Sequence, residues 1–193
     1  MKKAVFVASL FIFLFNLEAF SLIEETPFIF EQPLLITSAG QSAEVQLASV
    51  LAKRAGLTYT LSKIATSKDL ENIKTLVLVL GTSLKGLGAA GLDTAKEKAR
   101  VLLLLTEAQK KNIPLLCLHL GGESRRGQLT DEMIEDFLPF AKMAIVVKSG
   151  NKDGIFSKIC KEKNIPLIEV EKTVDALEPL KQAFKTGSSA NPA

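Results

Sequence analysis

The chain has 193 residues, a formal net charge of +3 at neutral pH and a charged fraction of 23%. This near balance of acidic and basic residues gives no reason to expect binding to nucleic acid or to an anionic membrane surface. The chain has no tryptophan and a single tyrosine, so a stacking platform for single-stranded nucleic acid is not expected either.

The N-terminal segment has the order of a secretory signal peptide. Lys2 and Lys3 precede an apolar run at Ala4–Phe15, and Ala19 and Ser21 are the small residues that precede a cleavage site after position 21. The apolar run is shorter than the roughly 20 residues that span a bilayer as a helix. We therefore predict export to the periplasm or the extracellular space without a permanent membrane anchor. The alternative is a buried N-terminal helix.

Residues 22–185 are predicted to form one domain, because this length suits a single hydrophobic core. The small and polar residues at 186–193 predict a disordered tail. Cys117 and Cys160 are the only cysteines. They could form a disulfide outside the cytosol, but both lie in apolar segments, where a buried free thiol is common. With a single histidine and no C-x-x-C motif, we expect neither a metal site nor a cofactor.

Apolar segments of β type alternate with helical segments along the predicted domain. Strands are expected at Leu34–Thr37, Thr58–Leu61, Thr75–Leu80, Ile113–Leu120, Met143–Val147 and Pro166–Val170. Helices are expected at Ala43–Ala55, Ser67–Asn72 (a short turn), Thr94–Lys111 (opened by a capping box of Thr94 and Glu97), Thr130–Ala141, Asp153–Lys163 and Thr173–Lys185.

Continuously apolar strands must be covered on both faces, and strands separated by helices pair in parallel. The sequence therefore predicts a single three-layer, doubly wound α/β domain with a mainly parallel sheet of five or six strands. Rossmann-like and flavodoxin-like strand orders both remain open.

The loops that leave strands differ from the loops that enter them. The entering loops are short, whereas the leaving loops are long and rich in glycine, serine and cations. The leaving loops are Thr37–Ser42, Gly81–Gly91, His119–Thr130 and Lys148–Gly154. Because ligands of parallel sheets bind beyond the carboxyl ends of the strands, we predict a site at that edge.

The first of these loops offers Ser38, Gly40, Gln41 and Ser42 as ligand-binding residues. Glycine allows close approach of the backbone, and the N–H groups at the following helix N-terminus favour an anion. An ordinary strand-to-helix turn, with Ser42 as N-cap, is an equal alternative.

The second loop offers Thr82, Ser83, Lys85, Gly86 and Gly88. It contains a G-x-G-x-x-G pattern, but its position after the third strand does not fit a dinucleotide fingerprint. We interpret it as a glycine-rich loop that exposes backbone N–H groups, with Lys85 as a charge beside them. A flexible lid without a ligand is the alternative.

The third loop offers His119, Gly121, Gly122, Arg125 and Arg126. The planar guanidinium of arginine suits a carboxylate or a phosphate. His119, at the end of a buried strand, could contact a ligand, transfer a proton or be purely structural.

The fourth loop adds Asn151 and Lys152, although its residues also suit a simple turn and helix cap. Across the four loops, basic side chains outnumber acidic ones. We therefore predict a small anionic ligand as the partner of this edge, with the oligomeric state left open.

The motifs TSAGQS, KGLGAAG, HLGGESRRG and KSGNKDG occur in this order behind the signal segment. In this the chain resembles a family of uncharacterised exported bacterial α/β domains over residues 33–185. The resemblance implies an extracytoplasmic bacterial setting and no particular activity. A binding module that holds a small anion at the carboxyl edge is the first hypothesis. A hydrolase or transferase acting on an anionic substrate, and an interaction domain for a membrane-protein partner, are the alternatives. No G-x-S-x-G elbow supports the enzyme.

Overall fold

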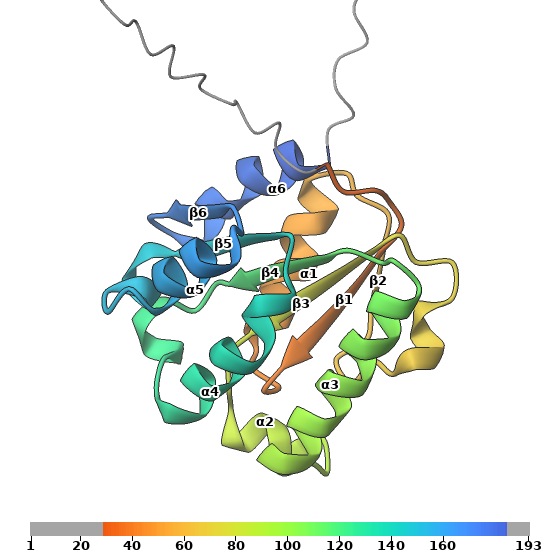
Figure 1. Ribbon diagram of the computed structural model, residues 1–193, viewed down its shortest axis with the longest axis horizontal. Helices are drawn as coiled ribbons and strands as arrows, with labels where there is room; N and C mark the ends of the chain where they lie inside the picture. The colour runs from red at the N-terminus through yellow and green to blue at the C-terminus, as the bar shows by residue number, and fades with distance from the viewer. Residues whose placement is uncertain (1–28, 185–193) are drawn as a thin grey trace, which may run out of the picture.

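The computed structural model describes residues 29–184, so the predicted signal segment and tail lie outside the described residues. Within this range one sheet of six parallel strands runs in the order β2-β1-β3-β4-β5-β6 (Figure 1). The strands are β1 (Leu34–Ala39), β2 (Tyr59–Leu61), β3 (Thr75–Leu80), β4 (Leu115–His119), β5 (Met143–Val147) and β6 (Leu167–Val170). The predicted parallel α/β domain is confirmed, and its strand order is the flavodoxin-like order extended by one strand.

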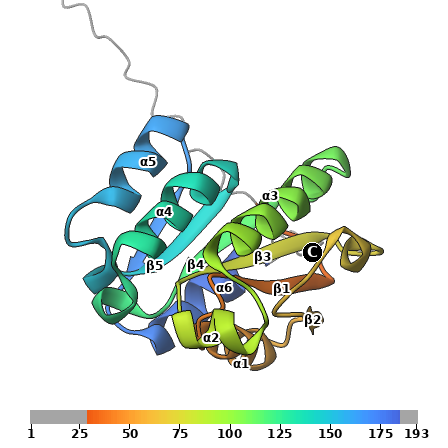
Figure 2. The same cartoon turned by 90° about the horizontal axis from the view of Figure 1, so that it is seen from below.

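Helices cover both faces of the sheet. The α-helices are α1 (Glu44–Arg54), α2 (Leu84–Ala89), α3 (Thr94–Lys110), α4 (Gln128–Phe137), α5 (Ile155–Lys163) and α6 (Leu177–Ala183). Short 3₁₀ turns are η1 (Ser67–Leu70), η2 (Gly122–Arg125), η3 (Leu138–Phe140), η4 (Lys148–Asn151) and η5 (Thr173–Ala176). Seen from below, α3, α4 and α5 lie on one face, and α1 and α6 lie on the other (Figure 2). The sequence did not predict α2.

The central strands are buried along their whole length, as their continuous apolar sequences require. Every residue of β1, β3, β4 and β5 is buried, whereas the edge strand β2 is partly exposed. Cys117 and Cys160 are free thiols buried in the cluster beneath α3, α4 and α5. Burial raises the pKa of both thiols, to about 11 for Cys160. In this structure the sulfurs are therefore core atoms.

The start of α3 differs from the predicted capping box. Asp93 is the N-cap, and its carboxylate accepts a hydrogen bond of 2.8 Å from the amide of Lys96. Thr94 is the first residue of the helix, and Glu97 points into the protein with no exposed surface. The capping box was wrong because an aspartate one position earlier is as good a cap as a threonine. Glu97 is thereby available for a buried contact.

None of the helices between residues 29 and 184 has the length and apolarity needed to cross a membrane.

Candidate functional site

The four glycine-rich loops converge at the carboxyl edge of the sheet. They have to do so because each follows a strand of one parallel sheet. Contacts also join them: Gln41 pairs with Thr82 in an isolated bridge, and the amide of Thr82 donates to Oγ1 of Thr130 over 2.9 Å. The hydroxyl of Ser149 accepts from the amide of Glu123 over 3.4 Å. The sequence-based grouping of these loops therefore matches the structure.

The boundary between β1 and β3 is where the chain leaves for opposite faces of the sheet, and folds of this kind bind ligands at such a point. Here the two loops lie directly against each other. The amide of Ser83 donates to the carbonyl of Gly40 over 2.8 Å. A Cβ added to Gly40, whose φ is +101°, would lie 2.5 Å from the carbonyl oxygen of Gly81. The protein's own backbone therefore fills the space between these two loop ends.

The second loop forms a helix where an open, glycine-rich anion loop was expected. Ser83 caps α2, and its hydroxyl accepts from the amide of Gly86 over 3.1 Å. A Cβ on Gly86 would lie 2.0 Å from the carbonyl oxygen of Gln41, so this glycine lets α2 pack on the first loop. Lys85 and Gly88 are exposed on the same helix. The amide of Gly86 is therefore bonded within α2 and is not free for a ligand, as an open loop would have left it.

A buried ion pair fastens the first loop to α3. Oε1 of Glu97 accepts hydrogen bonds of 2.9 Å from the amide of Gly40 and from Nε2 of Gln41. Arg100 pairs with the same carboxylate at 2.8 Å and donates to the carbonyl of Ser38. The Glu97 and Arg100 side chains are 0% and 11% exposed. Sequence reasoning missed both residues, and they hold the predicted ligand residues Gly40 and Gln41 in place.

A second charged cluster lies over the ends of β3 and β4. Nε of Arg125 donates to Oε1 of Glu44 over 2.6 Å. A Cβ on Gly121 would lie 2.1 Å from Cγ of Arg125, and one on Gly81 would lie 2.9 Å from Oγ of Ser42. The two glycines therefore leave room for these side chains to lie across the strand ends. We call Ser42, Glu44 and Arg125 the strand-end cluster.

Four polar side-chain atoms at this edge are buried and make no hydrogen bond of ordinary geometry within residues 29–184, although the Ser42 hydroxyl lies close enough to the Glu44 carboxylate to lower its pKa. They are Oγ of Ser42, Oε2 of Glu44, Oγ1 of Thr82 and Oγ of Ser38. Burial pushes the pKa of Glu44 upward, but the adjacent Ser42 hydroxyl and the Arg125 guanidinium outweigh it, so the net pKa lies below the ordinary value. The carboxylate is therefore charged at neutral pH. Leaving such atoms unpaired costs free energy.

His119 is fully buried and faces main-chain oxygens. Nδ1 lies 2.9 Å from the carbonyl oxygen of Leu80, and Nε2 lies 3.1 Å from that of Gly122. A Cβ on Gly150 would lie 2.5 Å from the ring. Burial lowers the pKa of His119, and the two carbonyls only partly offset it. With 0% exposure the ring has no surface for a ligand, so the structure gives it a structural position.

Arg126 is bound within the protein. Nε donates to Asp131 and Nη2 to Asp153, each over 2.7 Å, and Nη1 donates to the carbonyl of Gly150. The guanidinium also lies over the ring of Phe156, 5.9 Å from its centroid. Its side chain is 12% exposed. Arg126 therefore ties η2, α4 and the loop before α5 together and has little surface left for a ligand.

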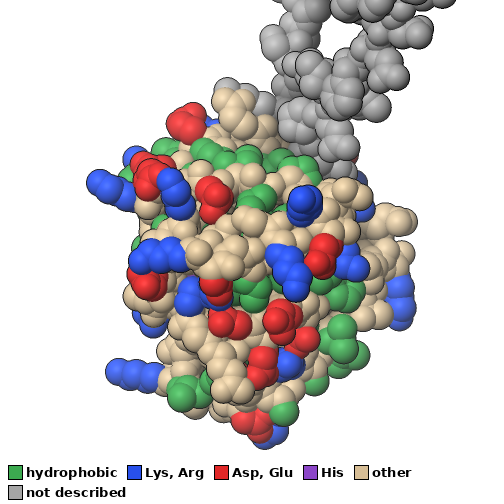
Figure 3. Space-filling view, turned by 60° about the vertical axis from the view of Figure 1, so that its left-hand side comes forward, with side chains coloured by type: hydrophobic (Ala, Val, Ile, Leu, Met, Phe, Trp, Pro, Cys, Tyr) green, Lys and Arg blue, Asp and Glu red, His purple; other side chains and the backbone are tan. Residues whose placement is uncertain are grey.

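The remaining predicted residues of this edge also have partners inside the protein. Oδ1 of Asn151 accepts from the amide of Phe156, in the first turn of α5, over 2.9 Å. Lys152 pairs with Glu123. A Cβ on Gly122 would lie 2.3 Å from Oγ of Ser149. Figure 3, which brings the left-hand side of Figure 1 forward, shows acidic and basic side chains interspersed. The expected excess of cations is thus largely balanced by acids.

Within residues 29–184 no group of three or more histidine, cysteine, aspartate or glutamate side chains is placed to hold a metal ion. The chemistry available at this edge is hydrogen bonding and ion pairing around the strand-end cluster.

Comparison with solved structures finds esterases and a lipolytic protein at low similarity. A protein assigned to the G-D-S-L lipolytic family of Desulfitobacterium hafniense DCB-2 is 14% identical, with 70% of this chain and 75% of that chain covered and a TM-score of 0.33. AlinE4, an SGNH-hydrolase family esterase, is 14% identical, with 83% and 85% covered and a TM-score of 0.29. Esterase EstA from Pseudoalteromonas sp. is 10% identical, with 72% and 78% covered and a TM-score of 0.31. No activity follows from likeness at this level.

Comparison with curated proteins finds no match. A family model described as "Domain of unknown function (DUF6305)" matches residues 31–184, which is nearly the whole of the described domain. The chain therefore belongs to the DUF6305 family.

Proposed function

We propose that this domain is a binding module whose ligand is a small organic anion that also carries a hydroxyl or amino group. The observation that carries the proposal is the strand-end cluster, in which a partly exposed arginine covers buried, unpaired polar atoms. The Arg125 side chain is 37% exposed. Within residues 29–184 only its Nε makes a hydrogen bond, so Nη1 and Nη2 are free to bind a carboxylate.

The unpaired atoms around Arg125 indicate the rest of the ligand. Oε2 of Glu44 is a carboxylate oxygen and can only accept a hydrogen bond, while the hydroxyls of Ser42 and Thr82 can donate or accept. A ligand hydroxyl or amine could pair with the carboxylate once the Arg125 side chain moves. The ligand would then gain hydrogen bonds that the buried groups lack without it.

The surroundings of His119 favour binding over catalysis. It is the chain's only histidine, and both of its ring nitrogens face main-chain carbonyls. A general base must reach the proton that it removes, and within residues 29–184 the hydrogen-bonding contacts of this ring are with the carbonyls of Leu80 and Gly122. The hydrolase or transferase alternative therefore has no specific support from the residues at this edge.

The ligand proposal is tested with L-lactate and propionate, two carboxylates that differ by one hydroxyl, in an NMR titration of the ¹⁵N-labelled domain. We expect saturable shifts of the amides of Ser42, Thr82 and Arg125, with tighter binding of lactate. Arg125→Met should abolish binding of both compounds, whereas Lys152→Met, which removes a paired surface cation of the same edge, should change neither. Shifts that are absent from these amides, or unchanged by Arg125→Met, would remove the proposal.

We also propose that the domain acts outside the cytoplasm after cleavage near residue 21. The proposal rests on the residue order of the N-terminal segment. N-terminal sequencing of protein recovered from the periplasm or the culture medium should give a chain that begins at Leu22. Recovered protein that still begins at Met1 would contradict it.

A further inference from the structure

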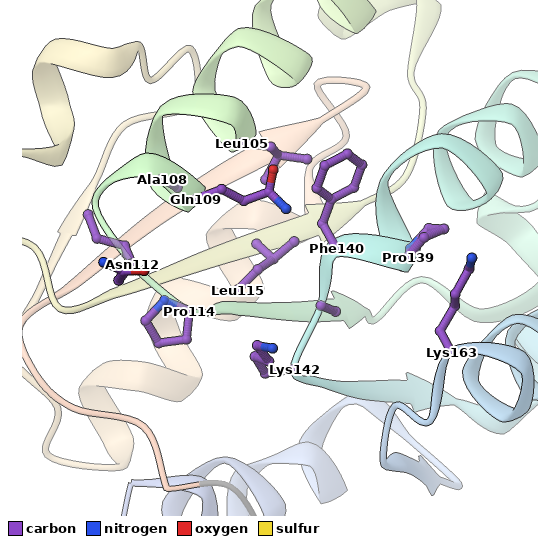
Figure 4. Close-up of a pocket in the computed structure, with 12 residues that line it drawn as sticks. Leu105, Ala108, Gln109, Asn112, Pro114, Leu115, Pro139, Phe140, Lys142 and Lys163 are labelled. Atoms are coloured by element: carbon purple, nitrogen blue, oxygen red, sulfur yellow. The ribbon is translucent and has the colours of Figure 1, made fainter.

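A cavity of about 560 Å³ lies at the amino edge of the sheet, opposite the glycine-rich loops. Figure 4 shows it between the end of α3, the start of β4 and the turn η3, with Lys163 of α5 at one side. One of the short loops that enter the strands, at residues 112–114, lies in its wall. This volume falls within the range of small-molecule sites.

Apolar side chains form about half of the wall of this cavity, beside polar groups that include Gln109 and Asn112. Leu105, Ala108 and Leu115 are buried side chains along it, and Pro114 and Phe140 are partly exposed. In Figure 4 the ring of Phe140 and the ring of Pro114 stand on either side of Leu115. Such a wall suits a short aliphatic or aromatic body, because burying that body removes apolar surface from water.

The charges at the cavity have one sign. Lys142 and Lys163 line it, and no aspartate or glutamate does. Neither lysine forms an ion pair within the described part of the chain. An adjoining cavity of about 320 Å³ shares Asn112 and Pro114 with it and adds Lys74 and Lys111, which are also unpaired, beside a single acid, Glu31. Unpaired positive charge therefore gathers at this edge.

We propose that the amino-edge cavity binds a small amphipathic anion. Its carboxylate would pair with one of the two lysine ammonium groups, of Lys142 or of Lys163, and its apolar body would lie against Pro114, Leu115 and Phe140. This site is separate from the strand-end cluster, from which it is divided by the length of the strands. The two proposals can therefore fail independently.

The probe is octanoate, with 1-octanol as the matched neutral compound and n-octylammonium as the matched cation, all below their aggregation concentrations. Isothermal titration should show saturable binding of octanoate, weaker binding of octanol and weakest binding of octylammonium. The double variant Lys142→Glu/Lys163→Glu should weaken octanoate binding about tenfold or more, since the charge that the carboxylate meets becomes repulsive at either lysine. Lys158→Glu changes an exposed, unpaired lysine of α5 outside the cavity and should leave the affinity unchanged.

Two further readouts keep the result unambiguous. Amide shifts on octanoate binding should centre on Leu115, Phe140 and Lys142, and Arg125→Met should not change them. The thermal stability of the double variant should be measured without ligand, because cations near the C-termini of α3 and α5 also offset the helix dipoles. No saturable octanoate binding at millimolar concentration, or equal binding by the wild type and the double variant, would overturn the proposal.

Discussion

The carboxyl and amino edges of the sheet differ in whether their basic side chains are paired and in whether they enclose a cavity. At the carboxyl edge the loops are long and glycine-rich, yet Arg125, Arg126 and Lys152 each pair with a carboxylate. At the amino edge the connections are short, yet they enclose a cavity of about 560 Å³ lined by Lys142 and Lys163 without acidic partners. A loop rich in glycine and cations therefore does not by itself mark an open anion site.

The glycines of the carboxyl edge explain this contrast. A Cβ on Gly40, Gly86 or Gly121 would meet another part of the protein at 2.5 Å or less. These residues are small so that loops and side chains of the protein itself can come close. Close approach brings the cations of one loop within reach of the carboxylates of another, and the pairs neutralise each other. At the amino edge the connections are short, and within residues 29–184 Lys142 and Lys163, which line the cavity there, form no ion pair.

The largest effect is expected from Glu97→Ala. The substitution leaves Arg100 buried without its carboxylate and removes the partner of Gly40 and Gln41, so the free energy of unfolding should fall by about 3–5 kcal/mol. Glu107→Ala is the matched control. Glu107 lies on the same helix toward the amino edge and pairs with Lys110 at the surface, so its loss should cost about 0.5 kcal/mol or less.

Urea unfolding of both glutamate variants decides this prediction. Equal losses for Glu97→Ala and Glu107→Ala would show that the charges at the carboxyl edge are no more important to the fold than surface pairs. The contrast between the edges would then be one of geometry alone.

A smaller effect is expected from Arg126→Met. Arg126 holds Asp131, Asp153 and the carbonyl of Gly150, and loss of its charged hydrogen bonds should lower the free energy of unfolding by about 1.5–3 kcal/mol. Lys152→Met in the same edge removes an exposed pair and should cost less than about 1 kcal/mol. If both variants unfold at the same urea concentration as the wild type, the contacts of Arg126 do not stabilise the fold. Arg126 would then again be a candidate for ligand binding.

The smallest effect concerns pH. Because the folded pKa of His119 lies below its ordinary value of 6.5, the unfolded chain binds a proton more readily than the folded protein. The stability that comes from the neutral ring is fully present above the unfolded pKa and decreases as pH falls below it. Between pH 8 and pH 5 the free energy of unfolding should therefore decrease, with the change beginning near pH 6.5.

His119→Gln is the control for this pH dependence. Glutamine keeps a hydrogen-bond donor but does not titrate, so the variant should lose the part of the decrease that begins near pH 6.5. Because His119 is the only histidine in the chain, an unchanged pH profile in the variant would mean that the pKa of the ring is the same in the folded and unfolded protein.

The alternation of apolar and helical segments was enough to predict a parallel α/β domain and to place the four loops at one edge. Both features depend on the spacing of apolar residues along the chain, which does not require knowledge of tertiary contacts. The same periodicity also indicates a buried charge. Glu97 precedes Val101 by one helical turn, on the face that also carries Leu104 and Ala108. A carboxylate on a core face needs a buried partner, and Arg100 stands three residues later.

Only the tertiary structure decided which charges meet and where a space remains. Arg125 and Glu44 are 81 residues apart in sequence, and the amino-edge cavity is lined by α3, η3 and the last residue of α5. Ion pairing falls off steeply with distance and depends on burial, so a count of cations in a loop says nothing about their partners. The strand order and the handedness of the crossovers bring distant loops together. Because of those contacts, most of the basic side chains predicted to form an anion site at the carboxyl edge are paired with acidic ones.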